Sequence, residues 1–143
     1  MVTERFGTLS VVVWVAAAAC ILVGRPAQAV KDSTISAGKA FYTQYCAKCH
    51  GPDGKGDGPA GKDMKPPPSD LTQLSKKNGG KFPYMDVLDI LDGETPYPAH
   101  GSSEMPAWGQ TFQSDVGVES GAQAAVRGKL MLITDYLRSI QQK

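Results

Sequence analysis

Cys46-Ala47-Lys48-Cys49-His50 places two thiols three residues apart and an imidazole directly after the second thiol. Residues three apart lie on the same face of a helical turn, so both thiols can reach one side of a flat ligand. The spacing C-x-x-C-H is typical of covalent haem attachment. In that chemistry each thiol adds to a vinyl group of the porphyrin, and the histidine binds the iron. The stretch therefore predicts a haem attached at Cys46 and Cys49, with His50 as one axial ligand.

Three other interpretations of this stretch compete with haem attachment. A disulfide between Cys46 and Cys49 would leave His50 and the loop-rich surroundings unexplained. A thioredoxin-like dithiol needs a strand-helix-strand context, and the chain has no persuasive strand pattern. A zinc site needs four ligands, of which Cys46, Cys49 and His100 would supply three, and a fourth is hard to name. Haem attachment is therefore the interpretation we adopt.

Apolar residues at helical spacing predict an all-α chain of three or four helices. The first helix is expected to begin at an N-cap on Ser33 or Ser36 and to end near Cys49-His50, before Gly51-Pro52. The later helices are expected from Leu71 to about Lys77 with Ser69 or Asp70 as N-cap, over residues 83–92, and over about 121–140.

Long loops are expected between these helices. Residues 51–69 contain five Gly and five Pro, and residues 94–109 form a second loop rich in the same residues. Structureless loops of this length are uncommon in a small compact domain. They become reasonable where a large group fills the core and the loops wrap around it, as a haem would.

Residues 1–29 read as a secretory signal peptide, cleaved after Ala29 in the pattern Ala27-Gln28-Ala29. The apolar run Leu9–Val23 is about 15 residues long, whereas a membrane-spanning helix needs about 20. An uncleaved anchor is the alternative, and Cys20 raises a lipoprotein as a third option. We prefer cleavage, which leaves a single domain over residues 30–143.

The composition narrows the class of protein. A chain of 143 residues is enough for one small domain, and a hydrophobic share of 41% is too high for disorder. Removing Arg5, Arg25 and Glu4 from 15 basic and 14 acidic residues leaves 13 of each in residues 30–143. A nucleic-acid binder would show a basic excess, so we expect no nucleic-acid partner.

The chain from about residue 33 to 140 resembles a class I c-type cytochrome of the small, single-haem, exported bacterial kind. The matching motifs follow the family's order: Gly38-Lys39-Ala40-Phe41-Tyr42, Cys46 to Gly51, Gly54 to Ala60, Pro66-Pro67-Pro68, Asp70-Leu71-Thr72, Met105-Pro106-Ala107-Trp108 and a C-terminal helix with Tyr136-Leu137. The resemblance implies the cytochrome c fold, one covalent haem c and crossed terminal helices, with Gly38 allowing a close approach at Tyr136. It also implies that a proline carbonyl, from Pro66, Pro67 or Pro68, accepts a hydrogen bond from His50.

The second axial ligand is expected to be a methionine. By resemblance to the family, the Met of the Met-Pro pair, Met105, is the distal ligand, and Pro106 favours an extended backbone there. Met85 and Met131 fall in helical segments, where Met is most often core filler. Met64 and His100 remain the alternatives. Trp108, close to Met105, is expected to line the haem pocket or to reach a haem propionate, or else to lie half-buried with its N–H in water.

These features predict an electron carrier, not an enzyme, because no catalytic acid, base or nucleophile stands out. It would pass single electrons between redox protein donors and acceptors in the periplasm, with a membrane-bound oxidase or reductase as one candidate partner. Seven lysines in the middle of the chain could steer an acidic partner if they ring the haem edge. The zero net charge of residues 30–143 favours ordinary surface lysines instead. The alternatives are a haem protein with an open iron site, such as a gas sensor or small peroxidase, and a subunit of a larger oxidase or dehydrogenase complex. The partners, potential and oligomeric state are left open.

Overall fold

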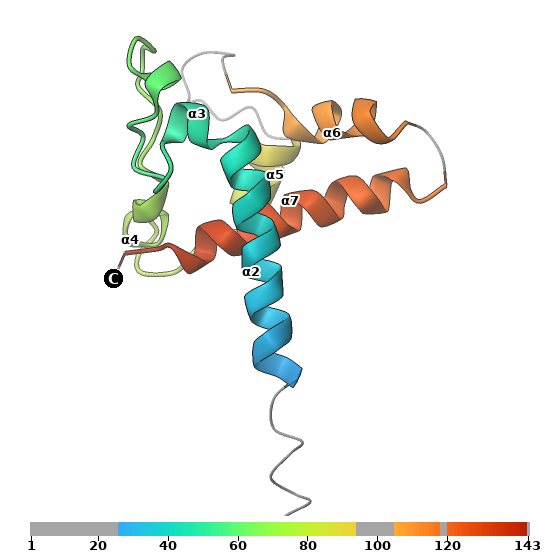
Figure 1. Cartoon of the computed structure of the whole chain (residues 1–143). Helices are drawn as coiled ribbons and strands as arrows, with labels where there is room; N and C mark the ends of the chain where they lie inside the picture. Colours follow the sequence, from blue (N-terminus) through green and yellow to red (C-terminus); the bar gives the residue numbers. More distant parts are fainter. Residues whose placement is uncertain (1–25, 94–104, 118–119, 143) are drawn as a thin grey trace, which may run out of the picture. The chain divides into compact units, whose positions relative to one another are not determined.

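The structure, a computed structural model, describes residues 26–93, 105–117 and 120–142 (Figure 1). Most of the expected signal peptide, with Cys20, and the alternative ligand His100 lie outside the described residues. The chain divides into two units after Ser33. The fold and the site presented below belong to the unit that begins at Thr34.

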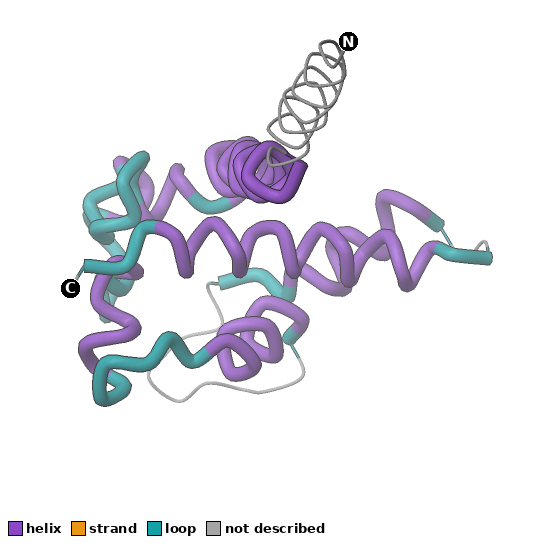
Figure 2. The backbone as a smooth tube through the Cα atoms, turned by 90° about the horizontal axis from the view of Figure 1, so that it is seen from below, coloured by secondary structure: helices purple, strands orange, loops and turns teal. Residues whose placement is uncertain are grey.

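The described residues form helices and loops, with no strand among them (Figure 2). The helices are α2 (Pro26–Tyr45), α3 (Ala47–His50), η2 (Pro59–Gly61), η3 (Leu71–Gln73), α4 (Leu74–Lys77), α5 (Tyr84–Asp92), α6 (Trp108–Val116) and α7 (Ala122–Ser139). The predicted all-α class is confirmed. The long loop from residue 51 to 70, interrupted only by the single turn of η2, is also present.

Three helices match their predicted positions closely. The helix expected over 83–92 is α5, and it ends at Gly93, whose φ of 87° is the left-handed value that favours glycine. The helix expected over 121–140 is α7. The helix expected from Leu71 to about Lys77 is present as η3 followed by α4. Asp70 caps η3, because its Oδ1 accepts a hydrogen bond of 2.9 Å from the Thr72 N–H.

The first helix departs from the prediction at both ends. Because α2 begins at Pro26, Ser33 and Ser36 lie inside the helix, so the prediction that either caps it was wrong. The Ser33 hydroxyl donates to the Val30 carbonyl one turn earlier instead. At the other end the helix does not run through to His50, because it is interrupted at Cys46, after which α3 begins.

Helix α6 was not predicted, because residues 94–109 were assigned to a loop and no helix was placed directly after them. Trp108, Phe112 and Val116 recur at a spacing of four and mark one face of this helix. That signal is short, and its neighbours are polar residues and a glycine. Phe112 is fully buried, so packing against the rest of the domain accounts for a helix that the local sequence only weakly favours.

The core lies where α5 and α6 pack against α7 (Figure 1). Its most deeply buried apolar side chains are Tyr42, Phe112, Leu130 and Ile133. Tyr42 from α2 packs on Tyr136 from α7, with ring centroids 5.1 Å apart. The core therefore joins the helix that leads into the cysteine motif to the C-terminal helix.

Gly38 permits the close approach of α2 and α7, as the resemblance implied. A Cβ placed on Gly38 would overlap the Leu132 carbonyl oxygen and would lie 2.9 Å from the Tyr136 Cβ. Glycine inside a helix costs about 1 kcal/mol relative to alanine. The close contact between α2 and α7 explains why glycine occupies this position despite its lower helix propensity.

We expect Gly38→Ala to lower the free energy of unfolding by about 1–3 kcal/mol, because the added methyl overpacks against backbone. Gly128→Ala in α7 is the matched control, since nothing lies within 4 Å of its added Cβ. The control should gain up to about 1 kcal/mol from helix propensity. Denaturant unfolding of both variants measures the difference, and equal stability of Gly38→Ala and the parent protein would contradict the packing argument.

Candidate functional site

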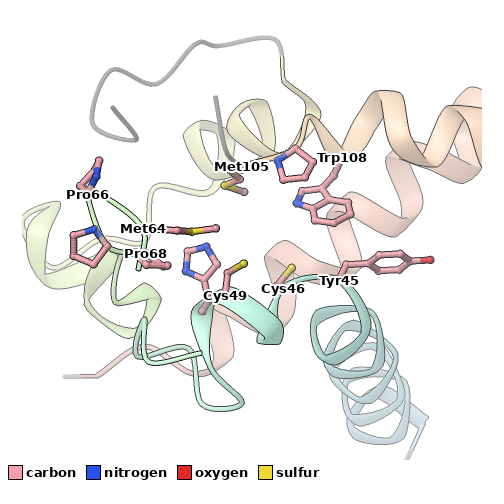
Figure 3. Close-up of a pocket in the computed structure, with 11 residues that line it drawn as sticks. Tyr45, Cys46, Cys49, Met64, Pro66, Pro68, Met105 and Trp108 are labelled. Carbon is pink, nitrogen blue, oxygen red and sulfur yellow. The ribbon is translucent and has the colours of Figure 1, made fainter. Parts of the chain in front are cut away.

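The cysteine motif forms one helical turn that faces a cavity. Cys46 and His50 are buried and Cys49 is partly exposed. The N–H groups of Cys49 and His50 donate to the Cys46 carbonyl at 3.1 and 2.9 Å, which closes the turn. Both cysteines are free thiols, and Figure 3 shows their sulfur atoms on the same side of the turn. The structure therefore brings the two thiols together as the spacing predicted.

The glycine-rich loop holds the far end of this turn. The Gly56 and Gly58 N–H groups donate to the carbonyls of His50 and Cys49 at 2.8 and 3.1 Å. A Cβ on Gly58 would lie 2.5 Å from the Cys49 carbonyl group, so this close approach requires glycine. The Tyr42 hydroxyl donates to the Gly51 carbonyl at 2.6 Å. These bonds satisfy the carbonyls that α3 leaves open.

The imidazole of His50 is oriented by a backbone carbonyl. Its Nδ1 lies 3.0 Å from the carbonyl oxygen of Ser69. A carbonyl oxygen only accepts hydrogen bonds, so Nδ1 carries a proton in this contact, and in the neutral ring the lone pair is then on Nε2. A ligating histidine in proteins is usually held in this way. The acceptor is one residue past the proline run, which corrects the expectation that Pro66, Pro67 or Pro68 supplies it.

The Cys46 thiol is in its neutral form near neutral pH. Burial is the larger cause and the electrostatic effect of the neighbouring Cys49 the smaller, and together they raise its pKa to about 12. Dithiols that work by exchange have lowered pKa values, because the thiolate is the nucleophile. This environment therefore does not resemble that of a thioredoxin-like redox pair.

Two cavities adjoin the motif. The larger, of about 330 Å³, is walled mainly by apolar side chains of the Leu71–Leu74 segment, α5 and α7, with Lys77, Asn78 and Asp86 among its polar residues. The smaller is lined by the three prolines, Met64 and Trp108 (Figure 3). Cys46, His50 and Met105 line both cavities. These shared residues make the two cavities adjoining parts of one slot.

The residues of the slot fit a haem. Two thiols, an imidazole and a thioether meet in an apolar space, and this donor set is the one that c-type haems use. A space of this size and lining is typical of a cofactor site. Cys46, Cys49, His50 and one methionine would hold the group.

Two methionines reach the slot, and two do not. Met64 and Met105 are partly buried and line it, whereas Met85 and Met131 are 53% and 44% exposed. Met105 lines both cavities and Met64 only the smaller one. Figure 3 shows both side chains on the side of the motif to which the cysteine sulfurs point. The choice of Met105 over Met64 remains a prediction.

An aromatic cluster, Tyr45, Trp108 and Phe112, closes one end of the slot. The Tyr45 ring lies edge-on to Trp108 and Phe112, with centroids 5.4 and 4.9 Å away. Trp108 is partly buried and lines the slot, as one of the two expectations had it. Sequence reasoning did not assign Tyr45 or Phe112 to the site. The position of Tyr45 directly before Cys46 was the available signal.

Comparison with known proteins identifies the class to which this fold and site belong. The family model described as Cytochrome c matches residues 35–123. The chain therefore belongs to the cytochrome c family, has the all-α fold of that family, and is a haem-binding protein of an electron-transfer class. Neither the curated proteins nor the solved structures contain a match to the chain.

Within residues 26–93, 105–117 and 120–142, no helix combines the length and the apolar character that crossing a membrane requires.

Proposed function

We propose that this chain carries one haem c, joined covalently to Cys46 and Cys49 and bound axially by His50 and Met105, and that it transfers single electrons. The observation that carries the proposal is the meeting of Cys46, His50 and Met105 in both parts of one apolar slot. A thioether and an imidazole on the same iron would leave no open position for a substrate. This arrangement favours a carrier over an enzyme or a sensor.

The chain's own residues provide binding, orientation and exclusion of water. The two thiols would tether the group, so that an exported protein does not lose it by dilution. The Ser69 carbonyl accepts a hydrogen bond from Nδ1 of His50 and orients the ring, and Nε2 is the nitrogen that would coordinate the iron. Side chains such as Leu74, Val87 and Leu137 make the wall of the slot apolar. The bound haem supplies a one-electron iron couple, and thioether ligation favours a relatively high potential.

The partners and the location belong to the same proposal. We infer redox protein donors and acceptors in the periplasm, reached after cleavage behind Ala29, as in the class I cytochromes of bacteria that the sequence resembles. The seven mid-chain lysines are exposed: Lys48, Lys55, Lys62, Lys65, Lys76, Lys77 and Lys81. Of these, Lys77 lies at the slot, where it could meet an acidic partner such as an oxidase or reductase.

The absorption spectrum of the reduced, purified protein with and without carbon monoxide tests the proposal. We expect the spectrum to stay unchanged when the gas is added, because both axial positions are held. A prompt shift to a carbonyl spectrum would overturn the carrier proposal and favour the alternative of an open iron site.

A further inference from the structure

Met105 lies just before α6, close in the sequence to the residues of α6 that contact α5. Met105 stands two residues before Ala107 and four before Gly109, at the start of α6. The last residues of α5, Asp92 and Gly93, lie against these same two positions. Two pairs, Gly93 with Ala107 and Asp92 with Gly109, therefore join the helices beside Met105. We call these two pairs the α5–α6 clamp.

Both pairs of the clamp are too close for a larger residue. A Cβ on Gly109 would overlap the Asp92 Oδ1 and would lie 2.7 Å from the Asp92 backbone oxygen. The side chain of Asp92 could turn away, but its backbone oxygen could move only with α5. A Cβ on Gly93 would lie 2.5 Å from the Ala107 Cβ. The two helices therefore approach each other very closely at these points. Each position requires glycine, because a larger residue would collide with the other helix.

Contacts besides the clamp also hold α6 in place. The Trp108 and Phe112 rings pack on Tyr45, and Phe112 is fully buried. The Thr111 N–H donates to the Ala107 carbonyl at 3.1 Å, which makes Ala107 part of the first turn. A helix held by these contacts determines where the residues just before it lie.

We propose that the α5–α6 clamp positions Met105, so that Gly93 and Gly109 are positioning residues for the axial thioether. The inference rests on the proposed role of Met105 as a ligand. Ordinary carbon–oxygen contacts are about 3.3–3.6 Å, so an added methyl at Gly109 would separate the helices by roughly half an ångström to one ångström. Displacements of about 1 Å at a site can cost about 100-fold. A small separation would therefore weaken the iron–sulfur bond.

Gly93→Ala, compared with Gly121→Ala, tests the clamp. Both glycines have left-handed φ values, 87° and 94°, but nothing lies within 4 Å of a Cβ added at Gly121. The two variants therefore carry the same backbone strain and differ in the contact with Ala107. We expect the affinity of the reduced protein for carbon monoxide to rise at least about tenfold in Gly93→Ala and to stay at the parent value in Gly121→Ala.

A second comparison separates positioning from general loss of stability. Gly109→Ala and Gly38→Ala both push a methyl into backbone, but Gly38 lies at the crossing of α2 and α7. Thermal unfolding should show that both variants are destabilised, whereas the rise in carbon monoxide affinity should occur only in Gly109→Ala. If Gly109→Ala does not accumulate, the Gly93→Ala pair decides.

The outcomes distinguish this inference from the proposed function. Prompt carbon monoxide binding by the parent protein would overturn the assignment of Met105 and the clamp with it. A parent protein that excludes the gas, with equal affinities in Gly93→Ala and Gly121→Ala, would overturn the clamp and leave the electron carrier standing. Equal rises in Gly109→Ala and Gly38→Ala would likewise show that the contact acts only through stability.

Discussion

Cys49→Ala, expressed in a host with haem-attachment machinery, is expected to lose most of its covalently bound haem, and Cys46→Ala/Cys49→Ala all of it. Each thiol supplies one of the two bonds to the porphyrin, and α3 presents both on one side of a closed turn. Haem staining after denaturing electrophoresis measures the covalent yield directly, because haem held only by axial ligands is lost on denaturation.

Lys48→Ala is the matched control for the cysteine variants. Lys48 occupies the same turn, and its side chain is exposed. The variant should therefore attach haem as the parent protein does. Undiminished attachment in Cys49→Ala would remove the central basis of the site and would return the disulfide and zinc interpretations to consideration.

Met105→Ala is expected to open the iron and to lower its reduction potential by on the order of 100 mV, a fraction of the roughly 0.8 V over which axial ligands set haem potentials. The thioether favours ferrous iron, so its loss favours the ferric form. The reduced variant should also bind carbon monoxide promptly. Redox titration and the spectrum with the gas give two independent measures of the same change.

Two further variants make the Met105 result specific. Met85→Ala should keep the parent potential, because Met85 is 53% exposed on α5. Met64→Ala should change the potential less than Met105→Ala, since Met64 lines only the smaller part of the slot. An unchanged potential in Met105→Ala would instead assign the ligand to Met64 or His100.

Several elements could be predicted because their signals are local. Gly93 takes the left-handed conformation that ends α5, and Asp70 bonds a backbone N–H two residues ahead. The buried residues of α7, among them Val126, Leu130 and Leu137, recur at helical spacing. In each case the residues that decide the structure are close together in the sequence.

The predictions that were wrong concern features that no short stretch of sequence decides. Helix α6 is stabilised by burial of Phe112 against distant parts of the domain, so its own nine residues predicted it weakly. The acceptor for His50 was expected among the prolines, yet the path of the loop brings the Ser69 carbonyl to the ring. The start of α2 was placed at a serine because serine caps helices well, but no local signal showed that the helix already extended back to Pro26.

The sequence by itself indicated the chemistry that we propose for this protein, because two thiols and an imidazole stand at the spacing typical of haem attachment. It also indicated the class of protein, because this spacing is a local signal. Only the tertiary structure decided which side chains share the slot. It brings together Met64, Met105 and Trp108 with the motif, and it sets α5 against α6 at Gly93 and Gly109. The physical reason is that these contacts depend on the close packing of helices far apart in the chain, which no local pattern encodes.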